Sequence, residues 1–267
     1  MIEESIIKKD REGLSLETIA PISHNWNSGD RERLIFYADL MGFSFKVNRT
    51  QHDELYQKFT DFKLDWHLKV KALDSEDTLR NVQFSDSILV AVDGTDGHCF
   101  DLITKAATCI MHCALKNQLP LKGVIAQGQF TWDKENEIYF GLPLVDAHLL
   151  HDEIYYYGVV VHHSAEKTVK DFSDFNNPYT NSQISLKKGQ TRHWHLAWHM
   201  LDEDLKPRDI KDDAMRWLNK IGETVSGTPR VYIDNTINIL DKDKNIGDQI
   251  FSNPEINDLI VMTQGIM

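Results

Sequence analysis

The sequence predicts an α+β sandwich, in which helices pack on a mostly antiparallel central sheet. Apolar runs of strand length and apolar stripes of helical period alternate in the order strand, helix, strand, strand, helix, strand, helix, strand. Short polar turns join the consecutive strands, as in antiparallel hairpins. No internal repeat or low-complexity tract interrupts this order, so one large domain with an extension accounts for the 267 residues.

The first half of the chain carries the clearest elements. Residues 33–39 (RLIFYAD) have the composition of a buried strand. Residues 52–72 carry one apolar stripe at spacings of four, three, four and four, which predicts a long amphipathic helix. The stripe consists of Leu55, Phe59, Phe62, Trp66 and Val70.

The next elements complete a core. Residues 81–94 (NVQFSDSILVAVDG) predict two short strands with a turn at Ser85 and Asp86, and a helix is expected over 99–117. Residues 121–132 alternate like a strand and lead through a polar turn into a hairpin. A further helix and a buried strand are expected at 143–153 and 155–163.

The last third of the chain is expected to be an α/β extension packed on this core. Residues 164–190 are polar and rich in Asn and Ser, which predicts a linker or an excursion. One more strand is expected at about 192–199, with helical stretches near 206–222 and 231–240. The predicted segments are an N-terminal segment 1–30, a core domain 31–163 and a C-terminal extension 164–267.

Composition and charge limit the classes of function. A hydrophobic content of 41% and a charged content of 26% are typical of a soluble globular protein. The net charge of −12 repels phosphate backbones, so we expect no nucleic acid polymer as a partner. A small polyanion would need metal ions or a nest of backbone N–H groups in order to bind.

The sequence indicates a cytoplasmic protein. No apolar run approaches the roughly 20 residues that a membrane helix needs, and the N-terminal residues lack the features of a secretory signal. The three cysteines, Cys99, Cys109 and Cys113, match no zinc-binding spacing and are expected to be free thiols. We therefore expect no membrane partner and a reducing compartment.

Two aspartates carry the chemistry that the sequence suggests. Asp39 ends the strand 33–39. Asp86 lies 47 residues later, in a turn between two strands that can lie next to the strand 33–39. Two adjacent carboxylates repel each other unless a positive charge lies between them. Divalent Mg²⁺ or Mn²⁺ prefers such oxygen ligands, although an aspartate at a strand end is more often a turn-former. Spacing alone leaves both interpretations open.

A phosphate cradle is expected next to Asp39. Residues Met41, Gly42, Phe43 and Ser44 form a turn whose backbone N–H groups could hold phosphate oxygens. The carbonyl of Leu40 could add a metal ligand. Metal-neutralised phosphate on an acidic protein would satisfy the condition set by the net charge.

These motifs resemble the class III nucleotidyl cyclases. "FYADLMGFS" is similar to the "FADIVGFT" signature of that family, and "QFSDSILVAV" is similar to its second metal segment, over about residues 31–163. The resemblance implies a cyclase homology domain in which Asp39, Leu40 and Asp86 bind two divalent cations (Mn²⁺ or Mg²⁺). It implies attack of the ribose 3′-hydroxyl on the α-phosphorus, with pyrophosphate leaving, in a homodimer with sites at its interface.

A narrower resemblance is to the pyrimidine cyclases of bacterial anti-phage defence. It rests on "FSDSI", "LKGVIAQGQ", "YFGLPLVDAHLL" and "PRVYIDNT". It implies conversion of UTP or CTP to cUMP or cCMP, a second messenger read by a separate effector. For the implied homodimer, Phe130 and Trp132 are either interface anchors or core residues.

The chain departs from the family pattern at two places. Purine cyclases carry a Lys that recognises the base shortly before the second metal-binding Asp. This chain has Val82 and Gln83 there instead. Arg80 is therefore the candidate nucleotide-binding residue, and Asn81 and Gln83 are further candidates. The family's paired Asn and Arg are absent from "FGLPLVDAHLL", where Asp146 and His148 lie nearby. The possible cationic substitutes are Lys46, Arg49 and Lys122.

Other motifs give weaker evidence of a metal or catalytic site. His193 and His195 would share one face of a strand, but no carboxylate or Cys partner is close in sequence, so a zinc site is disfavoured. Neither a GxSxG elbow nor a GxxxxGK loop is present. Three interpretations remain: a pyrimidine cyclase, a non-catalytic module that binds nucleotide or dimerises, and a purine cyclase.

Overall fold

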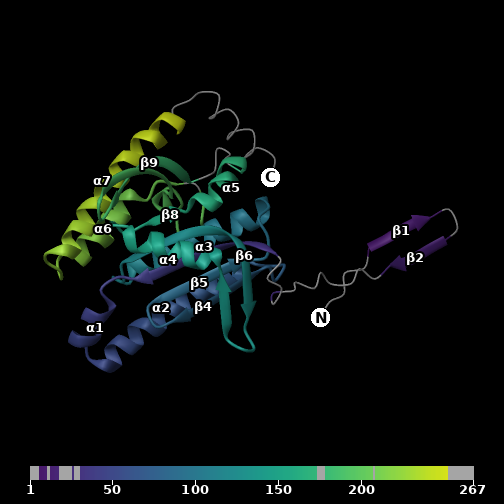
Figure 1. Cartoon of the computed structure of the whole chain (residues 1–267), viewed down its shortest axis with the longest axis horizontal. Coiled ribbons are helices and arrows are strands. Elements are labelled where there is room, and N and C mark those ends of the chain that lie inside the picture. The colour runs from purple at the N-terminus through teal and green to yellow at the C-terminus, as the bar shows by residue number, and fades with distance from the viewer. Residues whose placement is uncertain are drawn as a thin grey trace.

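The computed structural model describes residues 6–10, 13–17, 26, 31–172, 178–206 and 208–251. The expected N-terminal segment 1–30 and the end of the extension, 252–267, therefore lie largely or wholly outside the described residues. The first two strands, β1 (Ile6–Asp10) and β2 (Gly13–Glu17), form a two-stranded sheet of their own (Figure 1).

A mixed sheet with helices on both faces forms the body of the described chain, which confirms the predicted α+β class (Figure 1). The strands run in the order β4-β5-β3-β6-β8-β10-β9, and β7 pairs with β6. Only the β6–β8 pairing is parallel among the described strands, so the sheet is mostly antiparallel as predicted. The strands are β3 (Glu32–Leu40), β4 (Leu79–Phe84), β5 (Ser87–Val92), β6 (Leu121–Asp133), β7 (Ile138–Gly141), β8 (Val159–Val161), β9 (Tyr179–Leu186) and β10 (Gly189–Leu196).

The helices agree closely with the predicted stripes in the first half of the chain. The stripe over 52–72 is one helix, whose residues Phe62, Trp66 and Val70 are fully buried. The last two helices differ from the expected ranges, since one begins later and the other extends further. The helices are α1 (Phe43–Arg49), α2 (His52–Leu73), α3 (Gly97–Lys116), α4 (Leu142–Glu153), α5 (Glu166–Asp171), α6 (Lys211–Gly222) and α7 (Thr228–Phe251).

The two faces of β3 enter two different apolar clusters. Leu34, Phe36 and Ala38 belong to the larger cluster, to which α2 and α3 contribute. Ile35 points to the other cluster, on the side where α4 packs against β3 and β6. Because side chains alternate along a strand, Tyr37 and Asp39 fall on the α4 side. The strand register thus directs Asp39 toward α4.

Close packing at the centre of the sheet requires a glycine. Gly123 on β6 pairs with Ala38 on β3, and a Cβ at Gly123 would lie 2.5 Å from the Phe36 ring and 2.9 Å from the Ala38 Cβ. Such distances are shorter than van der Waals contact, so any side chain would separate the two strands. This glycine holds β3 and β6 together near the end of β3 that carries Asp39.

The prediction of a linker or excursion at 164–190 is wrong for the described residues of this range, which contain α5 and β9, whereas residues 173–177 lie outside them. β9 pairs with β10 along its whole length and ends the strand order, so it is an edge strand. Edge strands tolerate polar side chains, which explains the misleading Asn- and Ser-rich composition. The predicted strand 155–163 is also shorter than expected, since β8 has three residues.

The histidine-rich strand packs against α7. His195 Nε2 lies 2.9 Å from Asp243 Oδ2, and both side chains are buried. Thr180 on β9 donates a hydrogen bond to the same carboxylate over 3.1 Å. These contacts fasten α7 to the β9–β10 hairpin. No group of three or more His, Cys, Asp or Glu side chains in the described part of the chain is arranged to hold a metal ion.

Candidate active site

The strand register brings the two predicted aspartates to the same end of neighbouring strands. Asp39 on β3 pairs with Ser87 on β5, and Asp86 directly precedes Ser87. The backbone N–H of Leu40 donates to the carbonyl of Asp86 over 3.0 Å. Asp86 lies in the predicted turn, where Ser85 has a positive φ of 54°. The predicted neighbourhood of the two aspartates is therefore present in the backbone.

Asp39 has one oxygen in a hydrogen bond and one without. The Tyr37 hydroxyl donates to Oδ2 over 2.9 Å, and His151 Nε2 lies 3.7 Å from the same oxygen. Oδ1 is buried and has no hydrogen-bond partner among the described residues. A buried acceptor without a partner is costly, so Oδ1 has an unfilled need for a donor or a cation.

The surroundings of Asp39 shift the pKa of three neighbouring groups. Burial, and then the negative charge of Asp39, raises the pKa of the Tyr37 hydroxyl well above its usual range. Burial, and then the nearby Lys122 charge, lowers the pKa of His151 to about 4, so this imidazole is neutral at pH 7. Burial is also the main cause that lowers the pKa of Lys122 to about 8. These buried groups place the Asp39 carboxylate in a partly desolvated environment.

Lys122, one of the expected cationic substitutes, is buried and bonds to backbone carbonyls at the end of α4. It pairs with Asp39 in the β3–β6 register and so lies on the same face of the sheet. Its side chain is buried, and Nζ donates to the carbonyls of His151 (2.8 Å) and Ile154 (3.3 Å) at the end of α4. A cation at a helix C-terminus stabilises the last carbonyls. Lys122 therefore fastens α4 beside Asp39.

The expected phosphate cradle is the start of a short helix. Gly42 precedes α1 with a φ of 72°, and a Cβ there would meet no atom within 4 Å. The N–H of Met41 donates to the carbonyl of Pro120 over 2.6 Å and so already has an acceptor. Phe43 and Ser44 form the first turn of α1, where backbone N–H groups lack intrahelical acceptors. Phosphate binding by these four residues stays a prediction.

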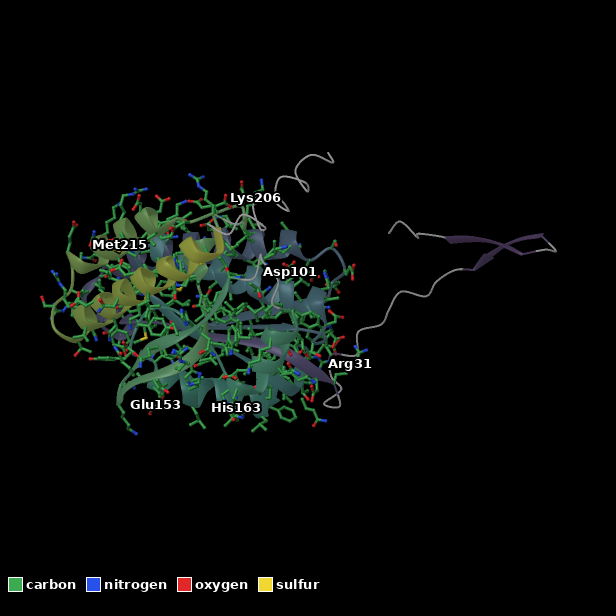
Figure 2. The ribbon with its side chains drawn as sticks, turned by 90° about the horizontal axis from the view of Figure 1, so that it is seen from above. Arg31, Asp101, Glu153, His163, Lys206 and Met215 are labelled. Atoms are coloured by element: carbon green, nitrogen blue, oxygen red, sulfur yellow. The ribbon has the colours of Figure 1, made fainter. Side chains whose placement is uncertain are left out.

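Arg80 lies toward the other end of the sheet. It pairs with Ala91, which pairs with Ile35, four residues before Asp39 and so about 13 Å along the strand. Its guanidinium contacts Asp77 over 2.7 Å and lies 5.0 Å from the centre of the Trp26 ring. Figure 2 labels one residue near each end of the sheet. Arg31 lies just before β3, and Glu153 lies at the end of α4, on the side of Asp39. The structure does not bring Arg80 beside Asp39.

The oxygen atoms at the end of β3 that carries Asp39 are suitable ligands for a hard divalent cation. Two carboxylates and the Leu40 carbonyl are oxygen ligands of the kind that Mg²⁺ and Mn²⁺ accept. The unpartnered Asp39 Oδ1 is the observation that supports this fit. Since few protein ligands are offered, water or other oxygen ligands would complete the coordination of such an ion.

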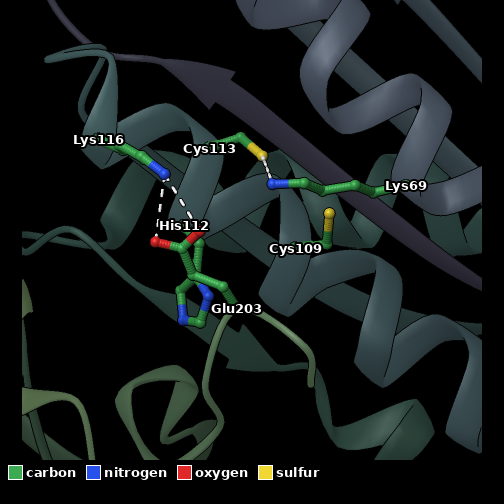
Figure 3. Close-up of a pocket in the computed structure, with 6 residues that line it drawn as sticks. All are labelled: Lys69, Cys109, His112, Cys113, Lys116 and Glu203. Atoms are coloured by element: carbon green, nitrogen blue, oxygen red, sulfur yellow. Dashed lines mark hydrogen bonds and ion pairs between the residues drawn. The ribbon is translucent and has the colours of Figure 1, made fainter. Parts of the chain in front are cut away.

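The cysteine cluster on α3 is separate from this site. Cys109 and Cys113 are buried free thiols, as predicted, and Lys69 Nζ lies 3.9 Å from Cys113 Sγ (Figure 3). Lys116 Nζ donates a hydrogen bond to Glu203 Oε1 over 3.1 Å beside the same cavity. The cavity between these side chains measures about 10 Å³, which is room for a single water molecule. No organic ligand fits there.

Sequence reasoning missed two groups around Asp39, Tyr37 and His151, and it named Lys122 without its contact to α4. A signal for Tyr37 was present, because residues two apart on a strand share a face. His151 had none, since α4 reaches Asp39 only through tertiary packing. Phe130 and Trp132 belong to the core, with exposed fractions of 0% and 2%.

Comparison with known proteins yields structural similarity alone. No family model and no curated protein matches the chain. The catalytic core of a rhodopsin-guanylyl cyclase with converted specificity, in complex with ATPαS, has a TM-score of 0.49 at 13% identity, over 62% of this chain and 94% of that chain. The adenylyl cyclase CyaB from P. aeruginosa has a TM-score of 0.45 at 13% identity, over 67% and 97% of the two chains. The guanylyl cyclase Cya2 has a TM-score of 0.42 at 13% identity, over 62% and 92%. With scores below 0.5, these similarities do not decide the function of this chain.

Proposed function

We propose that this chain is a metal-dependent nucleotidyl cyclase that acts on a pyrimidine nucleoside triphosphate. The reaction would convert UTP or CTP to the 3′,5′-cyclic monophosphate and pyrophosphate. The observation that carries the proposal is the placement of Asp39 and Asp86 at one end of adjacent strands, with Asp39 Oδ1 buried and unpartnered. The cyclase-like motifs around both aspartates support it.

The residues of the site would divide the work as follows. Asp39, Asp86 and the Leu40 carbonyl would hold the divalent cations, which supply charge neutralisation and activation of the ribose 3′-hydroxyl when bound. The N–H groups at Phe43 and Ser44 would orient the triphosphate. Because the attack is intramolecular, positioning by the protein contributes much of the rate. Arg80, in this proposal, contacts the nucleotide away from the metal end.

The proposed enzyme acts as a homodimer. An apolar stripe on α4 supports this, because Leu142, Val145 and Leu149 are more than half exposed although each is a large hydrophobic residue. Exposed apolar patches of this kind mark interaction surfaces. Among the described residues, no helix has the length and apolarity to cross a membrane. We place the enzyme in the cytoplasm and its product as an anti-phage second messenger for a separate effector.

The same stripe favours a second candidate function. A cyclase-homology module that only binds nucleotide or dimerises would need an apolar surface and would not need the family's paired Asn and Arg, which α4 lacks. The exposed positions Val145 and Leu149 agree with such a module. The buried, unpartnered Asp39 Oδ1 favours the enzyme, because a module has no use for a costly carboxylate there.

Product analysis separates the candidates. The purified chain is incubated with Mn²⁺ and, separately, with ATP, GTP, CTP or UTP, and products are identified by mass spectrometry. A cyclic pyrimidine monophosphate supports the proposal, whereas cyclic AMP or GMP would leave the cyclase and reject the base assignment. Nucleotide binding without any product would favour the module.

Asp39→Ala and Asp86→Ala should each abolish turnover without loss of fold. Asp101→Ala is the control, because Asp101 is an exposed carboxylate on α3 that pairs with Lys105. Near-wild-type turnover in either of the first two variants would reject the metal assignment.

A further inference from the structure

Tyr37 is the hydrogen-bond donor to the Asp39 carboxylate. It lies two residues before Asp39 on β3, so both side chains project from the same face of the sheet. Its hydroxyl donates to Oδ2 over 2.9 Å. A tyrosine hydroxyl is protonated at neutral pH, so the proton of this contact belongs to Tyr37. Oδ1 has no partner among the described residues.

Helix α4 holds the Tyr37 ring in place. The rings of His148 and His151 meet it edge-on, with centroid distances of 5.8 Å and 5.5 Å and interplanar angles of 75° and 76°. The end of α4 is in turn fastened to β6 by the buried Lys122, whose Nζ donates to the His151 carbonyl. The direction of the Tyr37 ring is therefore set by packing against α4, which the Lys122 contact in turn holds on β6.

A carboxylate held at one oxygen presents the other in a fixed direction. Rotation about the Cβ–Cγ bond of Asp39 exchanges its two oxygens, and the hydrogen bond to Oδ2 opposes that rotation. Mutation of a group that orients a metal ligand in this way typically lowers metal affinity about 10- to 100-fold. The contact also stabilises the negative charge of Asp39, whose strand neighbour Leu40 bonds to the backbone carbonyl of Asp86.

We propose that Tyr37 is a positioning residue that holds Asp39 so that Oδ1 is the oxygen offered to a divalent cation. The proposal rests on the proposed function, since it assigns a role to a side chain beside the same metal site. Tyr37 would act through Asp39 and would not touch the nucleotide. A purely structural role would make Tyr37 important for stability and leave metal affinity unchanged.

The test measures Mn²⁺ binding and turnover in Tyr37→Phe, which keeps the ring and removes the hydroxyl. Bound and free Mn²⁺ are distinguished by electron paramagnetic resonance without nucleotide, and turnover is measured against Mn²⁺ concentration. We expect Mn²⁺ affinity to fall about 10- to 100-fold, with the melting temperature close to that of the wild type. Tyr156→Phe is the matched control, because the Tyr156 hydroxyl is buried without a hydrogen-bond partner in the described residues.

The outcomes separate this proposal from the proposed function. Unchanged Mn²⁺ affinity in Tyr37→Phe, together with lost binding in Asp39→Ala, would overturn the role of Tyr37 and keep the metal site. Wild-type Mn²⁺ binding and wild-type turnover in Asp39→Ala, or neither binding nor turnover in the wild type, would overturn both. An equal loss in Tyr37→Phe and Tyr156→Phe would show a general effect on the fold and would also reject positioning.

Discussion

Replacement of Asp93 should destabilise the protein strongly, because Asp93 neutralises a buried arginine. Arg33 on β3 and Asp93 just after β5 are both fully buried. Arg33 Nε donates to Asp93 Oδ1 over 2.9 Å, and Nη2 lies 2.9 Å from the same oxygen. The Arg33 side chain also donates to the Phe130 carbonyl and lies against the Trp26 ring. Asp93→Ala would remove this carboxylate from the buried guanidinium.

The size of the effect follows from this burial. Removal of one partner of a buried ion pair costs about 3–5 kcal/mol, because the remaining charge keeps its desolvation penalty. For a protein of this length, each kcal/mol corresponds to roughly 2–4 °C in melting temperature. We therefore expect Asp93→Ala to lower the melting temperature by about 10 °C.

Thermal and urea unfolding of matched variants test this reasoning. Asp101→Ala serves as control, since the Asp101–Lys105 pair is exposed and joins residues four apart on one helix. Such surface pairs contribute less than about 1 kcal/mol. If Asp93→Ala unfolds within about 1 kcal/mol of Asp101→Ala, the buried pair does not stabilise this end of the sheet and the reasoning is refuted.

Two further predictions concern pH and assembly. Burial lowers the pKa of His112 and of His199 from 6.5 to about 4, so the unfolded chain binds more protons in this window, and stability should fall as pH drops from about 6.5 to about 4. The loss should be about 3 kcal/mol for each histidine, and His112→Gln should flatten the pH dependence of urea unfolding, whereas an unchanged slope would contradict the assignment. If α4 forms a homodimer interface, Leu149→Glu should give monomers in light scattering after size-exclusion chromatography. The control Leu68→Glu, at a similarly exposed apolar position on α2, should leave the dimer intact, and equal behaviour of both variants would reject this interface.

The sequence was most informative where a local pattern has one structural solution. The stripe at 52–72 has a single buried face as a helix, and α2 follows it closely. The turn at Ser85 and Asp86 was equally readable, because two apolar runs flank a polar pair. The edge strand β9 was missed, since a strand paired on one side only need not be apolar.

The sequence by itself determined that two aspartates end or join core strands, that each lies in a cyclase-like motif, and that the surface is acidic. Only the tertiary structure decided which groups surround Asp39. His151 arrives from α4 and Lys122 from β6, across 112 and 83 residues of chain, and no local pattern encodes such contacts. Side-chain periodicity sets the face on which a residue lies, whereas the partner on that face is set by strand register and helix packing.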